Sequence, residues 1–239
     1  MKPLEVCTVD CEAPEVVARL AIYREVLSSE ERQRIDRFLR PGDQRAHLVS
    51  TALLRWGLGR SLGVDGKSLR LEPGSHGKPT LTFPTAEVAF NASQSGQFAV
   101  AAFAPGGSVG VDVERIDERL DVMANAEGSF SPDEQALLTR APEDERRALF
   151  FRLWTLKEAY AKALGTGLST AFQEFTVRFG QGGEARIDGD AKGWWLSSVK
   201  VAEGYAGAVA FLAEGGRPTL EIRRVIPFEE WGGDGQAAR

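Results

Sequence analysis

The sequence predicts an α+β protein built from two pseudo-symmetric lobes, each a small antiparallel sheet packed on a long helix. The prediction depends on two observations about the 239-residue chain. Three sequence blocks recur in the same order, about 100 to 110 residues apart. In both copies one block has the apolar periodicity of a long helix, and another has two short apolar runs around a Gly-Gly turn, which is typical of a β-hairpin.

The first two blocks predict helices. Residues 27–32 and 130–135 each place a serine ahead of acidic residues, which is a helix-start signal. Residues 52–63 and 158–169 have helical periodicity and run into a stop that contains glycine. The two copies therefore contain matching helical segments.

The third block, residues 100–116 and 209–225, provides the predicted hairpin of each copy. The duplication places an N-terminal lobe at residues 1–117 and a C-terminal lobe at residues 118–226. The glycine-containing segment 227–239 is expected to be a flexible tail. Because residues of both copies converge at the seam between the lobes, we expect a ligand to bind there.

Composition excludes several classes of partner. The formal net charge is −5, and basic residues are scattered among acidic ones, so we expect no nucleic-acid partner. No apolar run is long enough to cross a bilayer, and the N-terminus lacks the pattern of a signal peptide, so we expect no membrane association. Cys7 and Cys11 match neither a disulfide framework nor a zinc site, which favours a cytoplasmic protein.

Two carboxylates stand two residues apart in a predicted strand. Asp112 and Glu114 point to one face of that strand, and the valines between and before them point to the other. This spacing fits a solvated acidic face as well as it fits a Mg²⁺ site, since Mg²⁺ binds carboxylates together with phosphate oxygens and water. The spacing alone leaves both interpretations open.

A second pair of charged residues lies in the predicted C-terminal helix. Glu158 and Lys162 are one turn apart on a common side, the ordinary arrangement of an exposed helix salt bridge. Trp154, Leu156 and Tyr160 leave little polar surface around them, which favours a cleft. The corresponding helix of the first copy lacks these charges, so each half is expected to contribute different groups to one site.

Two short polar motifs lie between the duplicated helix and hairpin. Residues 76–79 (HGKP) have the composition of a tight turn. Residues 91–96 (NASQSG) gather small hydrogen-bonding side chains before an apolar strand, and this pattern fits either a turn or a cradle for phosphate oxygens. Neither motif decides a function by itself.

In combination, HGKP, FNASQSG, GVDVE and FFRLWTLKEAYAKALGTGLS resemble the 4′-phosphopantetheinyl transferases. The resemblance spans residues 27–225 and is to their two-lobed, monomeric type, which activates carrier proteins of nonribosomal peptide and polyketide synthases. It implies an enzyme of the holo-acyl-carrier-protein synthase kind. Such an enzyme moves 4′-phosphopantetheine from coenzyme A to a serine of an apo acyl or peptidyl carrier protein, with Mg²⁺, and releases adenosine 3′,5′-bisphosphate.

The resemblance also implies roles for individual residues. The expected metal ligands are Asp112, Glu114 and Glu158. The expected coenzyme A contacts are Gly77, Lys78 and Pro79 at the adenine end, and Ser93, Gln94, Lys157 and Lys162 at the phosphates. Glu158 and Lys162 are the expected catalytic residues. Glu158 would act as the general base directly or through a metal-bound water, and Glu134 is a second candidate for ordering that water.

The sequence departs from the family pattern at two positions. Gln94 stands where many relatives have histidine, and Glu31 stands where some have lysine. Arg34 and Arg45 are therefore the expected contacts of the 3′-phosphate. Two other functions remain open for the same residues, namely a magnesium-dependent nucleotide hydrolase or nucleotidyltransferase and a catalytically silent module that binds carrier proteins.

Overall fold

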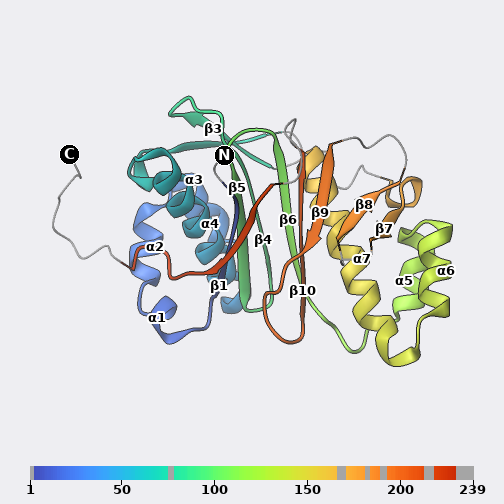
Figure 1. The fold of residues 1–239 in the computed structure, drawn as a ribbon. Helices are drawn as coiled ribbons and strands as arrows, with labels where there is room; N and C mark the ends of the chain where they lie inside the picture. Colours follow the sequence, from blue (N-terminus) through green and yellow to red (C-terminus); the bar gives the residue numbers. More distant parts are fainter. Residues whose placement is uncertain are drawn as a thin grey trace.

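Two lobes lie side by side, each with one long helix (Figure 1). The structure, a computed structural model, describes residues 3–74, 78–165, 171–180, 184–188, 193–212 and 218–229. The elements up to the middle of the chain are β1 (Leu4–Asp10), α1 (Pro14–Val17), α2 (Leu20–Val26), α3 (Ser29–Ile35), α4 (Pro41–Leu62), η1 (Gly66–Ser68), β2 (Arg70–Pro73), β3 (Pro79–Phe83), β4 (Ala89–Ser95), β5 (Phe98–Ala104) and β6 (Ser108–Arg115). The later elements are α5 (Val122–Ser129), α6 (Pro132–Arg140), α7 (Glu143–Leu164), η4 (Phe172–Glu174), β7 (Val177–Phe179), β8 (Ala185–Ile187), β9 (Trp194–Ser198), β10 (Tyr205–Leu212) and β11 (Leu220–Arg224).

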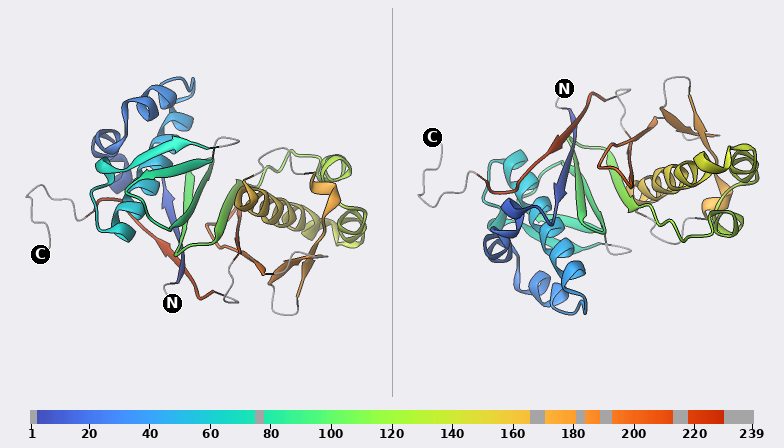
Figure 2. Two further views of the ribbon diagram at one scale, coloured as in Figure 1. Left: turned by 90° about the horizontal axis from the view of Figure 1, so that it is seen from above. Right: turned by 90° about the horizontal axis from the view of Figure 1, so that it is seen from below.

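Four layers follow one another across the molecule: α4, a sheet, a second sheet and α7 (Figures 1 and 2). The first sheet has the strand order β11-β1-β5-β4, and the second has the order β6-β10-β9-β8-β7. One apolar cluster packs α4 on β1 and β5, and another packs α7 on β9 and β10. A third cluster, which includes Val109, Val111 and Val113 of β6, fills the space between the sheets. The predicted α+β fold with two pseudo-symmetric lobes is confirmed.

The predicted hairpins and the boundary at residue 117 are wrong, because each copy sends its last strand to the other lobe. Strand β6 follows β5 in sequence but pairs along its whole length with β10. Strand β11 follows β10 but pairs in parallel with β1. Sequence periodicity identified the strands correctly, but it does not specify their partners. The lobes are thus joined by two exchanged strands.

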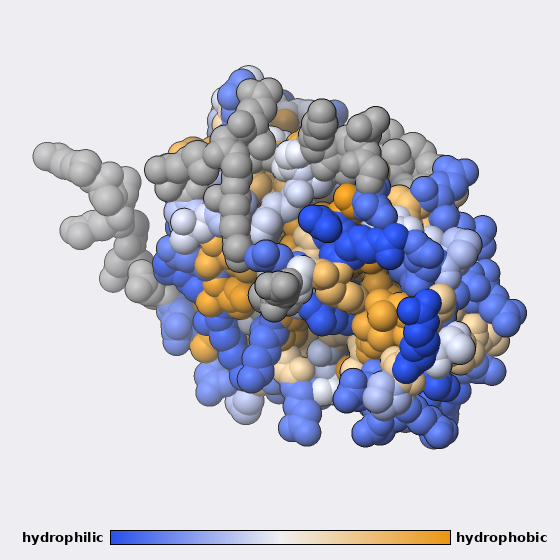
Figure 3. Space-filling model, turned by 45° about the vertical axis from the view of Figure 1, so that its right-hand side comes forward, coloured by the Kyte–Doolittle hydropathy of each residue, from blue (hydrophilic) through white to orange (hydrophobic). Residues whose placement is uncertain are grey.

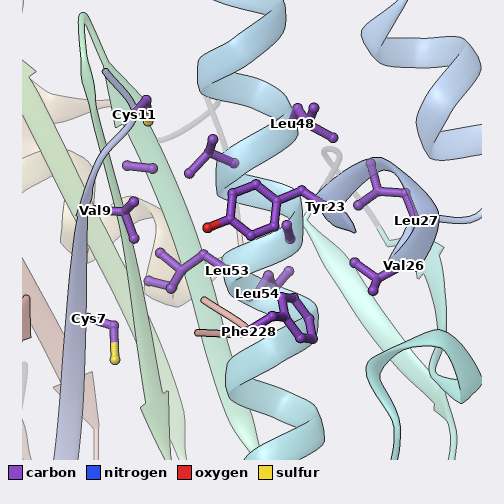
Figure 4. Packing of buried hydrophobic residues seen from close by; sticks show 14 of the residues in the cluster. Cys7, Val9, Cys11, Tyr23, Val26, Leu27, Leu48, Leu53, Leu54 and Phe228 are labelled. Atoms are coloured by element: carbon purple, nitrogen blue, oxygen red, sulfur yellow. The ribbon is translucent and has the colours of Figure 1, made fainter. Parts of the chain in front are cut away.

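The predicted flexible tail at residues 227–239 is wrong at its beginning. The side chain of Phe228 is 5% exposed and belongs to the N-terminal core cluster. Its ring centroid lies 6.3 Å from that of Tyr23 (Figure 4). Residues 230–239 lie outside the described part of the chain.

The predicted helix ends are confirmed. Helices α4 and α7 both have 22 residues, and each ends at a glycine with a left-handed backbone, Gly63 at φ 68° and Gly165 at φ 73°. Helices α3 and α6 both begin with a capping box, at Ser28 with Glu31 and at Ser131 with Glu134. Within the described part of the chain, no helix combines the length and the apolar composition that crossing a bilayer requires.

Each lobe contains the same buried polar junction, in which a cation of the long helix binds the glutamate of the capping box. In the N-terminal lobe, Nε of Arg55 lies 2.8 Å from Oε2 of Glu31. In the C-terminal lobe, Nζ of Lys157 lies 2.9 Å from Oε2 of Glu134. Each cation also donates to two backbone carbonyls three residues apart, those of Gly66 and Leu69 for Arg55 and those of Phe172 and Phe175 for Lys157.

These junctions correct the predicted alignment of the two copies. Arg55 and Lys157 both stand at the fifteenth position of their helices, so the helices correspond with an offset of about 102 residues. Trp56 therefore corresponds to Glu158, and Arg60 corresponds to Lys162. The sequence alignment had an offset of about 106 residues, which paired Glu158 with Ala52.

We expect Phe228→Ala to lower the free energy of unfolding by about 3 kcal/mol, because it leaves a cavity beside Tyr23 in a core that does not collapse fully. Urea unfolding measures the loss. Phe83→Ala is the matched control, because the Phe83 side chain is 52% exposed and should cost far less. Equal losses in the two variants would contradict the assignment of Phe228 to the core.

Candidate active site at the seam

Strands β4 and β6 meet at the seam through side chains. Residues 91–95 of the polar motif form most of strand β4, in which alternate residues point toward β6, and only Gly96 lies in a turn. Oδ1 of Asn91 accepts a hydrogen bond of 2.9 Å from the backbone N–H of Val111. Oγ of Ser95 accepts one of 3.0 Å from the N–H of Arg115. The small polar residues of the motif therefore satisfy the unpaired edge of β6.

Helix α7 lies directly against β6 because residue 110 is glycine. A Cβ atom at Gly110 would stand 2.0 Å from the carbonyl oxygen of Ala159 and 2.4 Å from the backbone nitrogen of Ala163. These contacts are with backbone, so no side-chain rotation relieves them. The close approach brings the last turn of α7 beside Asp112.

Asp112, Lys162 and Ser93 form a compact polar triad at this junction. Nζ of Lys162 donates to Oδ1 of Asp112 at 2.6 Å and to Oγ of Ser93 at 2.8 Å. The Ser93 hydroxyl in turn donates to Oδ1 of Asp112 at 2.9 Å. Asp112 is 2% exposed, and its Oδ2 has no hydrogen-bond partner. Burial raises the pKa of the Asp112 carboxyl, and the ammonium of Lys162 opposes that rise.

Glu114 and Glu158 add two half-buried carboxylates to the site. Burial, followed by the charge of Asp112, raises the pKa of Glu114 to about 7. The same two causes raise the pKa of Glu158. The Ser95 hydroxyl donates to Oε2 of Glu114 at 2.9 Å and orients it. Three acids thus crowd one partly dehydrated space that contains one ammonium, which is an arrangement typical of functional sites.

The donor set fits a hard divalent cation. Carboxylate oxygens are the ligands that Mg²⁺ prefers, and Asp112 Oδ2 is a buried acceptor that lacks a partner. Within the described ranges, however, no three acidic, histidine or cysteine side chains are gathered closely enough to hold a metal ion as they stand. In this arrangement Lys162 supplies the positive charge beside Asp112.

The predicted roles of Lys157 at the phosphates and of Glu134 in catalysis are wrong in this structure. The Lys157 side chain is 0% exposed, and its three donors are used by Glu134 and two carbonyls. The Glu134 side chain is 1% exposed and also accepts from the N–H groups of Val177 and Ser131. Both residues belong to the buried junction of the C-terminal lobe. Adjacent residues of a helix point in different directions, so burial of Lys157 leaves Glu158 at the seam.

The residues that we expected to bind the phosphate groups of coenzyme A do not all lie together. Gln94 follows Ser93 on a strand and so points to the opposite face, where Nε2 lies 3.3 Å from Nδ1 of His47. Exposed Arg34 lies close enough to His47 that its charge, after burial, lowers the pKa of the imidazole. Arg45, two residues before His47 on α4, pairs instead with Glu12 at 2.9 Å. The structure therefore brings Arg34 and Gln94 toward His47, and it turns Arg45 elsewhere.

The segment expected at the adenine end is described in part. Gly77 lies outside the described residues. Pro79 begins β3 and pairs with Pro73. The ammonium of Lys78 donates to the carbonyl oxygens of Val109 at 3.1 Å and Lys162 at 2.8 Å.

Two residues that the sequence analysis did not assign also contribute to this region. Ser95 orients Glu114, and the alternation of Asn91, Ser93 and Ser95 would have indicated it, had the motif been interpreted as a strand. His47 stacks on Phe38 with ring centroids 3.8 Å apart. No sequence signal connects His47 with Gln94, because they are 47 residues apart in the chain.

Similarity to known proteins defines the class to which this two-lobed protein belongs. The family model "4'-phosphopantetheinyl transferase, N-terminal" matches residues 16–106. The model "4'-phosphopantetheinyl transferase superfamily" matches residues 108–210. The boundary between the matches precedes β6, the strand that joins the second sheet.

Relatives identify the family. The 4′-phosphopantetheinyl transferase HetI of Nostoc sp. is 32% identical over 194 residues, which cover 80% of this chain and 81% of the relative. The 4′-phosphopantetheinyl transferase Sfp of Bacillus subtilis is 29% identical over 191 residues, with coverage of 78% and 83%. The chain therefore belongs to the 4′-phosphopantetheinyl transferase superfamily. The holo-[acyl-carrier-protein] synthase of Thermotoga maritima is 27% identical but overlays 46% of this chain and 64% of its own, with a TM-score of 0.37.

We expect the stability of the metal-free protein to fall as pH rises through about 7, in part because of Glu114. Folding raises the pKa of this carboxyl from 4.5 to about 7, so the folded state binds a proton that the unfolded state releases. The stabilising contribution is complete below the unfolded pKa and is lost above the folded one. In EDTA at pH 8, Glu114→Gln should therefore raise the free energy of unfolding by roughly 1 to 2 kcal/mol, with partial exposure already discounted.

Urea unfolding between pH 5 and 8 provides the measurement, with exposed Glu203→Gln as control. The gain from Glu114→Gln should shrink toward pH 5, and Glu203→Gln should show no comparable trend. A gain that is the same at every pH would contradict the raised pKa of Glu114.

Proposed function

We propose that this protein transfers 4′-phosphopantetheine from coenzyme A to a serine of an apo carrier protein, depends on Mg²⁺, and releases adenosine 3′,5′-bisphosphate. The observation that carries the proposal is the triad of Asp112, Lys162 and Ser93 at the seam, flanked by Glu114 and Glu158. Membership of the transferase superfamily supports it. Phosphoryl transfer needs positioned reactants and neutralised charge, which carboxylates together with an ammonium can provide.

Asp112, Glu114 and Glu158 would hold the Mg²⁺ ion. When bound, the ion supplies positive charge to the pyrophosphate oxygens of coenzyme A. Lys162 remains able to bind a phosphate oxygen, because its ammonium lies at the seam and its side chain is 29% exposed. Gly110 sets the close approach of α7 and β6, and Asn91 of β4 binds the backbone of β6, so these groups are held before the substrate arrives.

The reaction forms one bond and breaks one. The serine oxygen of the carrier attacks the β-phosphorus of coenzyme A, and the bond from that phosphorus to the bridging oxygen breaks. The electron pair leaves with adenosine 3′,5′-bisphosphate, and the serine proton passes to Glu158. Glu158 is half-buried at the seam, and we propose that it takes this proton either directly or through a metal-bound water.

A carrier protein would bind beside this seam, and the surface supports apolar contacts. On the side of the C-terminal lobe, apolar side chains form patches between hydrophilic ones (Figure 3). The enzyme has a formal charge of −5, so bulk attraction of an acidic carrier is not available. We propose that the enzyme acts as a monomer in the cytoplasm.

Incubation with coenzyme A, Mg²⁺ and an apo carrier tests the proposal. The carrier should gain the mass of 4′-phosphopantetheine, and EDTA should abolish the gain. Hydrolysis of the nucleotide with no modified carrier would support a hydrolase instead, and carrier binding without any reaction would support a silent binding module.

Asp112→Asn should lower kcat by at least about 100-fold, since it removes a buried charge beside Lys162.

We expect Glu158→Gln and Glu134→Gln to separate catalysis from folding. Glu158→Gln should reduce kcat by about 100-fold or more with little loss of stability, because Glu158 is half-buried beside the triad. Glu134→Gln should cost roughly 2 to 4 kcal/mol of stability, because it leaves Lys157 charged and buried.

Initial rates and urea unfolding at low temperature distinguish the two effects. The folded fraction of Glu134→Gln should keep kcat within about two-fold of wild type, because the amide oxygen of glutamine still accepts hydrogen bonds and keeps α7 in place. If Glu134→Gln stayed stable but lost activity as Glu158→Gln does, Glu134 would be a catalytic residue after all. A double variant with Lys157→Met should recover part of the stability, because it also removes the unpaired cation.

A further inference from the structure

Lys78 uses its ammonium group in an unusual way. Nζ donates to the carbonyl oxygens of Val109 at 3.1 Å and Lys162 at 2.8 Å, with a longer contact of 3.5 Å to that of Ala163. None of the ion pairs found among the described residues includes Lys78. Burial lowers the pKa of this lysine. The cation is thus held by backbone oxygens of two elements that lie far from it in sequence.

These oxygens form a favourable site for a cation. Lys162 and Ala163 belong to the last turn of α7, where carbonyls lack partners within the helix. The aligned peptide dipoles place partial negative charge at this end, which favours a positive group. Val109 contributes from β6, beside the close approach at Gly110. The ammonium therefore binds at the place where β6 and α7 are packed backbone to backbone.

The element that carries Lys78 is small and depends on such a contact. Strands β2 and β3 form a separate two-stranded sheet of four and five residues. Leu71 and Leu81 pack against the N-terminal core, and the N–H of Gly74 donates to the carbonyl of Lys78 at 2.8 Å. An isolated two-stranded hairpin is marginal in water. The two strands are thus anchored in the N-terminal lobe by Leu71 and Leu81, and the start of β3 is anchored on the C-terminal lobe by Lys78.

Helix α7 is held more firmly than the β2–β3 hairpin, so Lys78 positions the hairpin and not the helix. Helix α7 has 22 residues and is packed on β6 and β10, whereas β2 and β3 are largely exposed. Removing the ammonium should therefore release the start of β3 from the C-terminal lobe and leave α7 in place. The triad should persist, because Asp112, Lys162 and Ser93 are supported by β6, α7 and β4.

We propose that Lys78 is a positioning residue that fastens the β2–β3 hairpin across the seam, next to Lys162, and so completes the wall that binds the coenzyme A donor. The proposal rests on the proposed function, because it takes coenzyme A as the ligand at the seam. The ammonium itself does not bind the phosphates, since its donors are occupied by carbonyl oxygens. Lys78 acts through the placement of the hairpin.

The test uses Lys78→Met in the full-length protein, which keeps an unbranched side chain but removes the charge and the donors. Lys67→Met is the matched control, because Lys67 is 50% exposed and has one ion-pair contact of 3.9 Å. We expect Lys78→Met to raise the KM for coenzyme A about ten-fold, with kcat within two-fold and the KM for the carrier unchanged. Lys78→Arg should restore the KM for coenzyme A to within about three-fold, because a guanidinium also donates to carbonyls.

Amide hydrogen exchange without substrate tests the tether independently of activity. Exchange in β2 and β3 should become at least ten-fold faster in Lys78→Met than in Lys67→Met, with α7 unchanged. Unchanged exchange in the hairpin, or an equal effect on kcat and on both KM values, would overturn the proposal. A wild-type protein that modifies no carrier would refute the proposed function, whereas the exchange experiment would still report on the tether.

Discussion

The long helix of each lobe is fixed by a buried cation that binds the capping-box glutamate and two loop carbonyls. In the N-terminal lobe the cation is Arg55, and in the C-terminal lobe it is Lys157. Removing either partner would leave a charge without a counter-ion in a dehydrated space, so the pair constrains how the helix rotates. In α7 this rotation buries Lys157 and leaves Glu158 and Lys162 at the seam. The position of the site thus depends on a junction that takes no part in the chemistry.

The same junction in both lobes shows how duplicated halves have come to differ. The residue after the cation is Trp56 in one copy and Glu158 in the other. Five residues after the cation, Arg60 pairs with Glu5 and stacks on Trp56, whereas Lys162 binds Asp112. The two lobes share these buried bonds, whereas the neighbouring surface carries a structural ion pair in one lobe and a polar site in the other.

The seam joins the two sheets through side chains as well as through exchanged strands. Strand β6 belongs to the second sheet, yet Asn91 and Ser95 of the first sheet bind its free backbone groups. Burial still raises the pKa of Asp112 and Glu114, so the folded protein holds carboxyl groups in an unfavourable environment. Such a cost is common where groups must be ready to bind a cation or accept a proton.

The sequence by itself determined the class of fold, the helix starts and stops, and the two acids on one face of a strand. These features follow from local periodicity, from capping at Ser28 and Ser131, and from glycine at the helix ends. Family motifs also indicated Glu158 and Lys162. All of these signals lie within a few residues of one another, and local backbone geometry expresses them directly.

The tertiary structure alone decided which strand pairs with which, and which polar residues of a motif are buried. Neighbouring residues such as Lys157 and Glu158, or Ser93 and Gln94, are all polar but point to different sides, and the sequence placed both members of each pair at the site. The sequence also does not reveal the exchange of β6 and β11, because a strand has the same alternation of apolar and polar residues whichever sheet it joins. Burial is a property of the assembled layers, so it separated the structural cations and acids from those that remain at the seam.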